Sequence, residues 1–239
     1  MASKKTAIVT GASQGIGATV ARAFLDRGYN VVGNARSFSR ANFTPSPNLA
    51  LVEGDIGLAT TAEKIAQTAL EKFGSIDHVV SNAGIFKSKP FTDYTAVEFR
   101  GFVSTNLEGF IFITQLAVKQ MLAQGTGGSV TCITAALTAN PIAGVPASIP
   151  TITKGGLDAV ILSLANEYAK SNIRFNAVAP GVVDTHLDET QRDLMKALSP
   201  MGTIADPKDI ADAVVYLTEA RYVTGEILHV DGGAHAGRW

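Results

Sequence analysis

The chain has 239 residues, of which 20 are basic and 21 acidic, so its formal net charge is −1. This balance gives no basic surface for nucleic acid or for an acidic membrane, and we expect neither partner. With 46% hydrophobic and 17% charged residues the chain can bury a large core, and its single cysteine, Cys132, rules out an internal disulfide framework and a cysteine-based zinc site.

Short runs rich in β-branched residues alternate along the chain with longer stretches of helical period. The predicted strands are Thr6–Thr10, Asn30–Gly33, Ala50–Glu53, His78–Ser81, Ser129–Ile133, Arg174–Ala179 and Glu226–Val230. The predicted helices are Gly15–Arg27, Ala62–Lys72, Ala96–Ala123, Thr151–Lys170 and Pro207–Glu219. Most of the strands are apolar on both faces, which is typical of a parallel sheet covered by helices on both sides. The sequence therefore predicts an α/β fold with a doubly wound parallel sheet of about seven strands.

The stretch from Gly181 to Ala205 breaks this alternation, because it is long, polar and poorly periodic. In an α/β domain a loop of that length is usually a lid or a binding loop. We predict a lid over about residues 182–205. Since no linker, tandem repeat or low-complexity segment is present, residues 1–239 are predicted to form one domain.

The first predicted strand runs directly into a glycine-rich turn that opens the first helix, Gly11-Ala12-Ser13-Gln14-Gly15-Ile16-Gly17. Glycines let the backbone turn sharply and approach a pyrophosphate, and the helix N-terminus supplies unpaired N–H groups. The position between a strand and a helix favours a dinucleotide site over a simple tight turn. The predicted binding residues are Gly11, Ser13, Gln14, Gly15, Ile16 and Gly17.

The end of the second predicted strand discriminates between cofactors. It reads Asn34-Ala35-Arg36-Ser37 and contains no acidic residue. A carboxylate there would bind the ribose hydroxyls and repel a 2′-phosphate, whereas a guanidinium and a hydroxyl suit that phosphate. We therefore expect NADP(H) to be preferred, with NAD(H) as the other possibility. The alternative is that Arg36 is only a solvated surface residue.

With these glycines in place, the chain resembles a classical short-chain dehydrogenase/reductase over nearly all of its length. The further matching motifs are Asp55-Ile56, Asn82-Ala83-Gly84, Asn106, Lys154, Pro180-Gly181 with Val183 and Thr185, and Asp231-Gly232-Gly233. The resemblance implies a Rossmann-like fold and assigns roles to the matching residues. Asp55 and Ile56 would contact the adenine, and the Asn-Ala-Gly turn would line the cofactor cleft. Asn106 would hold a proton-relay water, Lys154 would be catalytic, and the Pro-Gly to Thr segment would lie on the nicotinamide side.

The resemblance breaks at the acid/base residues. Members of this family carry a tyrosine acid/base four residues before the lysine, and a serine about thirteen residues before that tyrosine. In this chain the tyrosine position holds Pro150, and the serine position holds Leu137 or, by alignment on the strand, Ala135. Proline has no hydroxyl and no ionisable group. Tyr168 is fourteen residues beyond Lys154, or about 20 Å along a helix, and cannot substitute.

Three functions remain open at this point. The favoured one is an NADP(H)-dependent oxidoreductase that acts on a carbonyl or alcohol with a non-standard proton donor. That donor would be Lys154, a water held by Asn106 and Lys154, or a side chain among Asp184, His186 and His235. The second is a cofactor-binding pseudoenzyme that serves as a sensor or scaffold. The third is a non-redox lyase or isomerase with Lys154 as base. Four hydroxyls are expected near the site but chiefly as turn, cap or strand-end groups, namely Thr134, Thr138, Ser148 and Thr151.

Two segments are predicted to wall the substrate pocket, the loop Leu137–Ile149 and the lid. The lid contributes Leu187, Leu194, Met195, Leu198 and Met201. Because the residues expected to wall the pocket are mostly apolar, we expect a small, moderately hydrophobic substrate. We predict no metal site.

The helices 96–123 and 151–170 are apolar over much of their circumference. One face must cover the sheet, and the surplus predicts a subunit interface. Members of the family that the chain resembles commonly assemble through these helices, so the resemblance implies a homo-oligomer, either a tetramer or a dimer. With no apolar signal segment and no run of about 18 apolar residues, we expect a cytoplasmic protein without a membrane partner.

Overall fold

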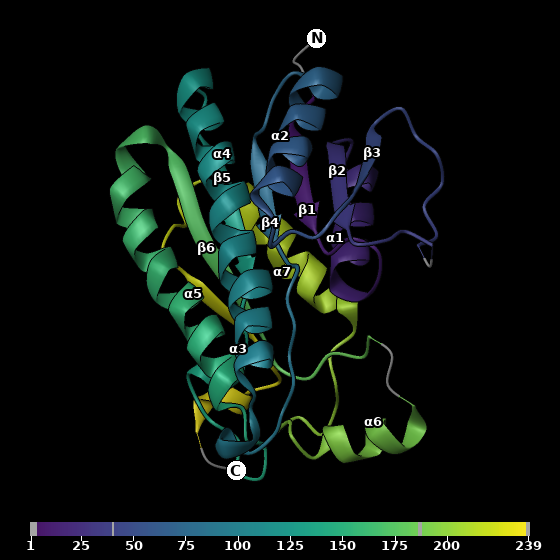
Figure 1. The fold of residues 1–239 in the computed structure, drawn as a ribbon, viewed down its shortest axis with the longest axis vertical. Coiled ribbons are helices and arrows are strands. Elements are labelled where there is room, and N and C mark those ends of the chain that lie inside the picture. The colour runs from purple at the N-terminus through teal and green to yellow at the C-terminus, as the bar shows by residue number, and fades with distance from the viewer. Residues whose placement is uncertain (1–3, 40, 186–187, 238–239) are drawn as a thin grey trace.

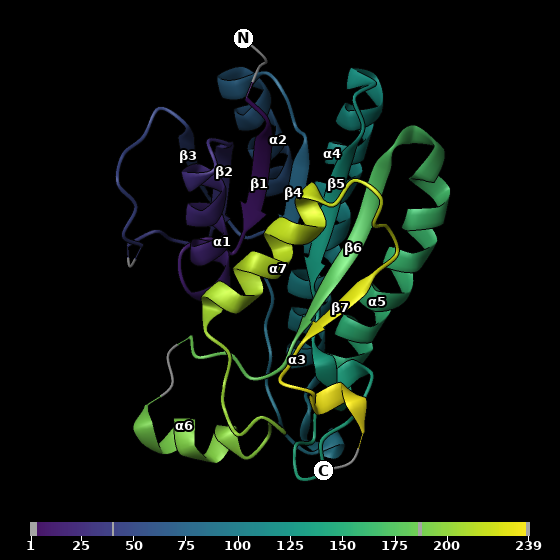
Figure 2. The ribbon, with the colours of Figure 1, turned by 180° about the vertical axis from the view of Figure 1, so that it is seen from behind.

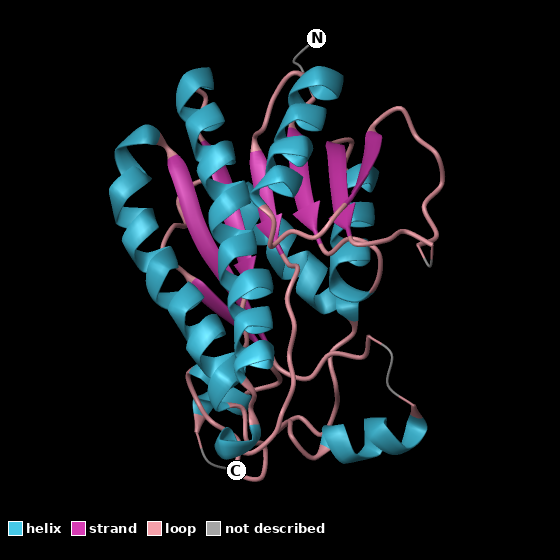
Figure 3. Ribbon diagram, viewed as in Figure 1, coloured by secondary structure: helices cyan, strands magenta, loops and turns pink. Residues whose placement is uncertain are grey.

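The computed structural model describes residues 4–39, 41–185 and 188–237, and its centre is a sheet of parallel strands (Figures 1 and 3). The strands are β1 (Thr6–Thr10), β2 (Asn30–Ala35), β3 (Leu49–Glu53), β4 (His78–Ser81), β5 (Gly128–Ile133), β6 (Ile173–Pro180) and β7 (Ile227–Val230). Their order is β3-β2-β1-β4-β5-β6-β7. The chain thus winds outward from β1 to β3 and then returns beside β1 with β4. This confirms the predicted single-domain α/β fold with a seven-stranded parallel sheet.

Helices cover both faces of this sheet. On one face lie α2 (Ala59–Phe73), α4 (Gly109–Gln124) and α5 (Ser148–Tyr168), as Figure 1 shows. On the other lie α1 (Gly15–Asp26) and α7 (Pro207–Glu219), which are in front in Figure 2. Successive side chains of a strand point to opposite faces, so Ile8 packs into the core on the α2 side and Val9 into the core on the α7 side. Two covered faces explain why the strands are continuously apolar.

The helix predicted over 96–123 is interrupted. It begins as α3 (Ala96–Phe102), widens into a π-helical turn (Val103–Glu108) and continues as α4. The turn places Asn106 inside the protein, with 2% of its surface exposed. The widened turn could not be predicted from the sequence, because a single polar residue within a helix does not indicate one. Such π-helical turns occur frequently at functional sites.

The helical segment Ala96–Gln124, taken together with its π-helical turn, is long and apolar enough to cross a membrane by length and composition alone. In the structure it packs beside the sheet instead. Ile113, Ala117 and Met121 are at most 1% exposed and belong to the core on the α2 side. The outer surfaces of α4 and α5 carry exposed Ile111, Leu122 and Leu162, and their pairing with another copy of the chain stays a prediction.

The segment predicted as an irregular lid contains a helix, α6 (Glu189–Lys196). Asp188 accepts a hydrogen bond from the backbone of Gln191, and the Gln191 side chain accepts one from the backbone of Asp188. This capping box starts the helix. The sequence-based prediction missed it because α6 has only two apolar residues, Leu194 and Met195, and no buried residue. In Figure 1 it lies apart from the sheet, beyond the carboxyl ends of the strands.

Helix α5 starts at Ser148, three residues before the predicted start. Pro150 is therefore the third residue of the helix. The first N–H groups of a helix have no intrahelical partner, so a proline there removes no backbone hydrogen bond. Its carbonyl accepts a hydrogen bond from the Thr153 hydroxyl at 3.1 Å. The structure thus explains how the helix tolerates proline at the position that precedes Lys154.

A histidine is buried at the amino end of β4, far from the carboxyl ends of the strands. His78 is 3% exposed, and its Nδ1 lies 2.8 Å from the Ser129 hydroxyl. Its Nε2 is buried without a hydrogen-bond partner among the described residues. Burial, reinforced by the positive charges of Lys5 and Arg174, lowers the pKa of His78 to about 3.

This histidine is expected to make the protein sensitive to acid. The unfolded chain binds the proton below about pH 6.5, but the folded chain resists it. The free energy of unfolding should therefore fall as the pH decreases, by about 3 kcal/mol from pH 7 to pH 4 for this group. Urea denaturation across that range measures the effect. His78→Asn keeps a polar atom near Ser129 without a titrating ring, and an equally steep loss in that variant would contradict the assignment.

Candidate functional site

A cleft of about 630 Å³ lies at the carboxyl ends of the strands, where the chain order reverses between β1 and β4. In doubly wound sheets this is the place where ligands bind. Every predicted cofactor-binding residue except Ser37 lines this cleft. Ser37 instead forms a hydrogen bond with Ser39, at 3.2 Å between the two hydroxyl oxygens.

The glycine-rich turn forms the floor of the cleft. Gly11 and Gly15 have φ values of +67° and +55°, which favour glycine. A Cβ on Gly17 would lie 2.3 Å from the Gly11 carbonyl oxygen, so the turn closes only without side chains at these positions. Gln14, which precedes α1, makes no side-chain cap to it. The first N–H groups of α1 are therefore available to an anion, as dinucleotide binding requires.

Asn82 fixes the two strand ends beside this turn. Its Nδ2 donates to the carbonyls of Thr10 at 2.9 Å and Gly11 at 3.3 Å. The Thr10 hydroxyl in turn accepts hydrogen bonds from the backbone N–H groups of Asn82 and Ala83. These bonds join the ends of β1 and β4 across the point where the chain order reverses. The Asn-Ala-Gly turn is thus a structural part of the cleft wall.

At the opposite end of the cleft from Lys154, Arg36 follows β2 directly. Arg36 is exposed, lines the cleft and forms no ion pair with the described residues. The neighbouring acid Glu53 accepts a hydrogen bond from the backbone of Phe38 at 2.9 Å. Asn34, which also lines the cleft, donates to the carbonyls of Val52 and Gly54. The guanidinium is therefore the one positive group that this end of the described cleft offers to a ligand.

Lys154 projects from α5 into the cleft and is 8% exposed. Its Nζ donates to the Ile133 carbonyl at the end of β5, at 2.6 Å. A Cβ at Gly84 would lie 3.0 Å from that Nζ, so the glycine leaves room for the amino group. Burial lowers the pKa of Lys154, while Cys132 and Asp158 act in the opposite direction.

Asn106 braces the wall of the cleft rather than lining it. Its Oδ1 accepts a hydrogen bond from the Ile85 N–H at 2.8 Å. Its Nδ2 donates to the Ile85 carbonyl at 3.2 Å and to the Thr153 hydroxyl at 3.0 Å. Both amide protons are therefore used. The side chain connects the loop after β4 to the residue before Lys154.

The described lining contains no tyrosine, histidine, cysteine or glutamate, and its ionisable side chains are Arg36, Asp55 and Lys154. The position four residues before Lys154 holds Pro150, and the two candidate serine positions, Ala135 and Leu137, both line the cleft. Around Lys154 the described lining thus offers a single ionisable group.

The other proposed donors lie elsewhere. Asp184 pairs with Arg192 at 2.7 Å and does not line the cleft. His235 pairs with Asp231 at 2.9 Å and stacks on His229, also outside the lining. His186 falls outside the described residues. Of the four nearby hydroxyls only that of Thr134 belongs to a lining residue, whereas Thr138, Ser148 and Thr151 do not line the cleft.

Beyond Lys154 the cleft is mostly apolar. The predicted loop contributes Leu137, Ile142 and Val145, and the lid contributes Met195 and Leu198. The lid residues Leu194 and Met201 are instead exposed, and Leu187 falls outside the described residues. Sequence reasoning missed further lining residues, namely Gly54, Ile85, Phe86, Thr105, Ile133, Ala136 and Ala234. For Phe86 a signal was available, because it follows the Asn-Ala-Gly turn by two residues.

Comparison with known proteins gives a consistent result over the whole chain. A family model described as "Enoyl-(Acyl carrier protein) reductase" matches residues 11–235. An L-rhamnose 1-dehydrogenase (NAD(P)(+)) of Sphingomonas sp. is 35% identical over 246 residues, covering 97% of this chain and 96% of the relative.

Solved structures agree with this. A 3-ketoacyl-(acyl-carrier-protein) reductase from Brucella melitensis complexed with NADH superposes with a TM-score of 0.90 at 28% identity, over 98% of this chain and 99% of the other. ElxO with NADP bound has a TM-score of 0.88 at 27% identity, over 98% and 100% of the two chains. The sequence motifs, the cleft and these relatives all point to one class of protein.

Proposed function

The chain belongs to the short-chain dehydrogenase/reductase family, and its relatives are oxidoreductases. From this premise we propose that the protein catalyses an NADP(H)-dependent reaction on a small, moderately hydrophobic carbonyl or alcohol, with Lys154 as the proton donor. One observation carries the proposal. Lys154 is the single ionisable group of the described lining at the apolar end of the cleft.

The cofactor residues fit a dinucleotide phosphate. The glycine turn and the uncapped start of α1 would hold the pyrophosphate, and Arg36 would pair with a 2′-phosphate. When bound, NADP(H) supplies or accepts a hydride. The relatives are described with different cofactors, namely NAD(P)(+), NADH and NADP. The proposed preference for NADP(H) therefore rests on Arg36 and on the absence of an acid at the end of β2.

Lys154 would give its proton to the oxygen of a reduced carbonyl. Because burial lowers the pKa of Lys154, its ammonium is a stronger acid than that of an exposed lysine. General acid catalysis is most effective when the pKa of the donor approaches the working pH. Asn106 has both amide protons bonded within the protein. In this proposal it is a positioning residue, which holds α5 and the loop after β4 together.

A second candidate function is favoured by Pro150, which lacks the hydroxyl of the family's acid. In this reading the chain binds NADP(H) and performs no redox chemistry. NADPH fluorescence during titration measures binding, and absorbance at 340 nm with a panel of ketones, quinones and imines measures turnover. Binding with turnover supports the oxidoreductase, and binding without turnover across the panel supports the second candidate. Absence of binding contradicts both.

Replacing Arg36 with aspartate is expected to reverse the cofactor preference. The carboxylate repels a 2′-phosphate and accepts hydrogen bonds from ribose hydroxyls. Loss of a charged hydrogen bond should raise the Kd of NADPH by about ten- to a hundredfold, with a fall in the Kd of NADH. Fluorescence titration with both cofactors measures this. Arg100→Asp makes the same charge change at an exposed residue of α3, and an equal loss in that variant would contradict the assignment.

A further inference from the structure

The segment after β4 forms one wall at the apolar end of the cleft, and its backbone is fixed on both sides of Phe86. On one side, the N–H and the carbonyl of Ile85 are both bonded to the Asn106 side chain. On the other side, the Tyr94 hydroxyl donates to the carbonyl of Lys87. Phe86 therefore lies between two anchored residues, which fix the position of its main chain.

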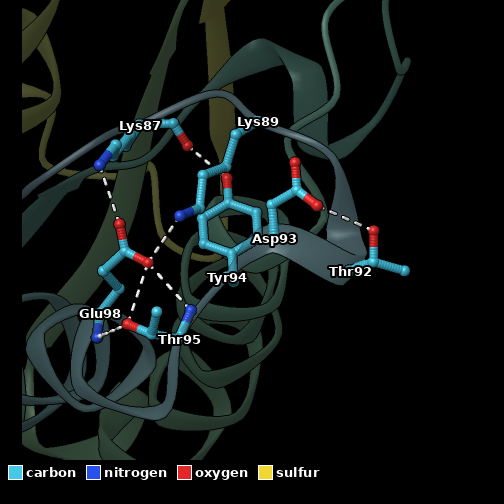
Figure 4. Close-up of polar contacts among 7 residues, drawn as sticks. All are labelled: Lys87, Lys89, Thr92, Asp93, Tyr94, Thr95 and Glu98. Atoms are coloured by element: carbon cyan, nitrogen blue, oxygen red, sulfur yellow. Dashed lines mark hydrogen bonds and ion pairs between the residues drawn. The ribbon is translucent and has the colours of Figure 1, made fainter.

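A cluster of charges extends this anchoring (Figure 4). Lys87 and Lys89 pair with the two carboxylate oxygens of Glu98, at 2.8 and 2.7 Å. Hydrogen bonds from these lysines hold the pKa of Glu98 below its usual range, so the pairs persist at neutral and mildly acidic pH. Glu98 also completes the capping box with Thr95 that starts α3. The loop is thereby tied to a helix end.

The same loop is joined to a second segment of the cleft lining. The Ser88 hydroxyl donates to the Pro146 carbonyl at 2.9 Å. Pro146 directly follows Val145, which lines the cleft. The loop that carries Phe86 and the loop that carries Val145 are therefore in direct contact.

Phe86 is 52% exposed although it lines the cleft. An aromatic ring with half of its surface free gains by burial against a ligand, and it prefers a flat partner. The lining includes the apolar side chains of Ile142, Val145 and Leu198, together with the polar residues Thr134 and Asn140. A flat molecule with an apolar ring and a few polar atoms matches such a lining.

We propose that Phe86 selects the substrate of the NADPH-dependent reaction, and that this substrate is a flat conjugated dicarbonyl compound, a quinone. The inference rests on the proposed function and narrows its substrate class. Hydride addition to a simple ketone leaves an alkoxide, a strong base that needs an acid in the transition state. Hydride addition to a quinone leaves a hydroquinone anion, a much weaker base. A site with Pro150 in place of the family's acid suits the second reaction better.

The overall reaction is balanced. NADPH supplies one hydride, which carries both electrons to the quinone. One proton, from the Lys154 ammonium or from water, gives the neutral hydroquinone. NADP⁺ is the second product, and Lys154 regains its proton from solvent.

The affinity for a quinone, measured under conditions in which no reaction occurs, tests the role of Phe86. The probe is 2,3-dimethyl-1,4-naphthoquinone, whose substituted ring carbons resist addition of thiols and amines. Calorimetric titration into protein saturated with NADP⁺ gives its Kd. Phe86→Ala should raise that Kd about tenfold, and Phe86→Tyr should leave it within about twofold. Phe91→Ala removes a 66% exposed ring of the same loop that does not line the cleft, and it should have no effect. An unchanged Kd in Phe86→Ala overturns the proposal.

Turnover tests the substrate class. The comparison is 1-tetralone, which has the same two-ring skeleton and one carbonyl. With NADPH, kcat/KM for the quinone should exceed that for tetralone at least about a hundredfold, after subtraction of the reaction without protein. Phe86→Ala should raise KM for the quinone and leave kcat nearly unchanged. Equal or faster reduction of tetralone overturns the inference while leaving the proposed function intact. Failure of the unmodified protein to bind NADPH overturns both.

Discussion

Ketone reduction is expected to rise about 10²- to 10⁴-fold in the double variant Pro150→Tyr with Ala135→Ser, because this range is what a general acid contributes. Positions 150 and 154 are one turn of α5 apart, and residues at that spacing lie on the same face of a helix. Ala135 lines the cleft beside them. The new phenol would therefore project toward the Lys154 amino group, and the new hydroxyl would face the same space.

NADPH oxidation with 1-tetralone, followed at 340 nm, measures this gain. The matched control is Pro150→Phe with Ala135→Ser, which supplies the ring without its hydroxyl. The Kd of NADPH should be similar in the two double variants, so that their difference reports proton transfer. Equal rates with the tyrosine and the phenylalanine variants would show that the missing acid does not limit ketone reduction. Thermal unfolding of both variants verifies that α5 accepts the larger side chain in place of the buried proline.

The second large change in activity is expected when the amino group of Lys154 is removed. We expect Lys154→Met to lower kcat/KM for 1-tetralone about 10²-fold or more, since proton transfer and positioning are both lost. The sign of the pH dependence follows from the ammonium being the donor. Activity should be full below the pKa of Lys154 and should decline as the pH rises through it. Because burial lowers that pKa, the decline should begin at lower pH than for an exposed lysine.

Lys154→Arg separates charge from proton donation. A guanidinium keeps the positive charge but does not deprotonate in the accessible range, so the alkaline decline should disappear along with most of the activity. Lys170→Met removes an exposed lysine beyond the carboxyl end of the same helix and should be without effect. If the alkaline decline persisted in the arginine variant, another group would be the donor.

The sequence was sufficient to predict the sheet and the glycine-turn end of the cleft because both depend on local patterns. Continuous apolar runs such as Thr6–Thr10 identify strands covered on both faces. The glycine turn after β1 is required by backbone geometry alone, as the close approach of Gly17 to Gly11 shows. These constraints involve residues near one another in the chain, and so they are visible without coordinates.

The apolar end of the cleft was less predictable because its geometry depends on contacts between distant segments. Asn106 forms hydrogen bonds with Ile85, which is 21 residues away in the sequence, and with Thr153, which is 47 residues away. The residues next to Asn106 in the sequence predict neither those bonds nor the π-helical turn that buries its side chain. Helix α6 was missed for a different reason. It is short and polar, with two apolar residues and no buried residue, so little in its composition distinguishes it from a polar loop.

The lack of any buried residue in α6 has a kinetic consequence. An eight-residue helix with no buried residue is only marginally stable in water. Its local unfolding free energy is then expected to be small compared with that of α4 or α5, which cover the sheet. Local melting of α6 is therefore expected to open the part of the cleft that Met195 lines while the rest of the protein stays folded.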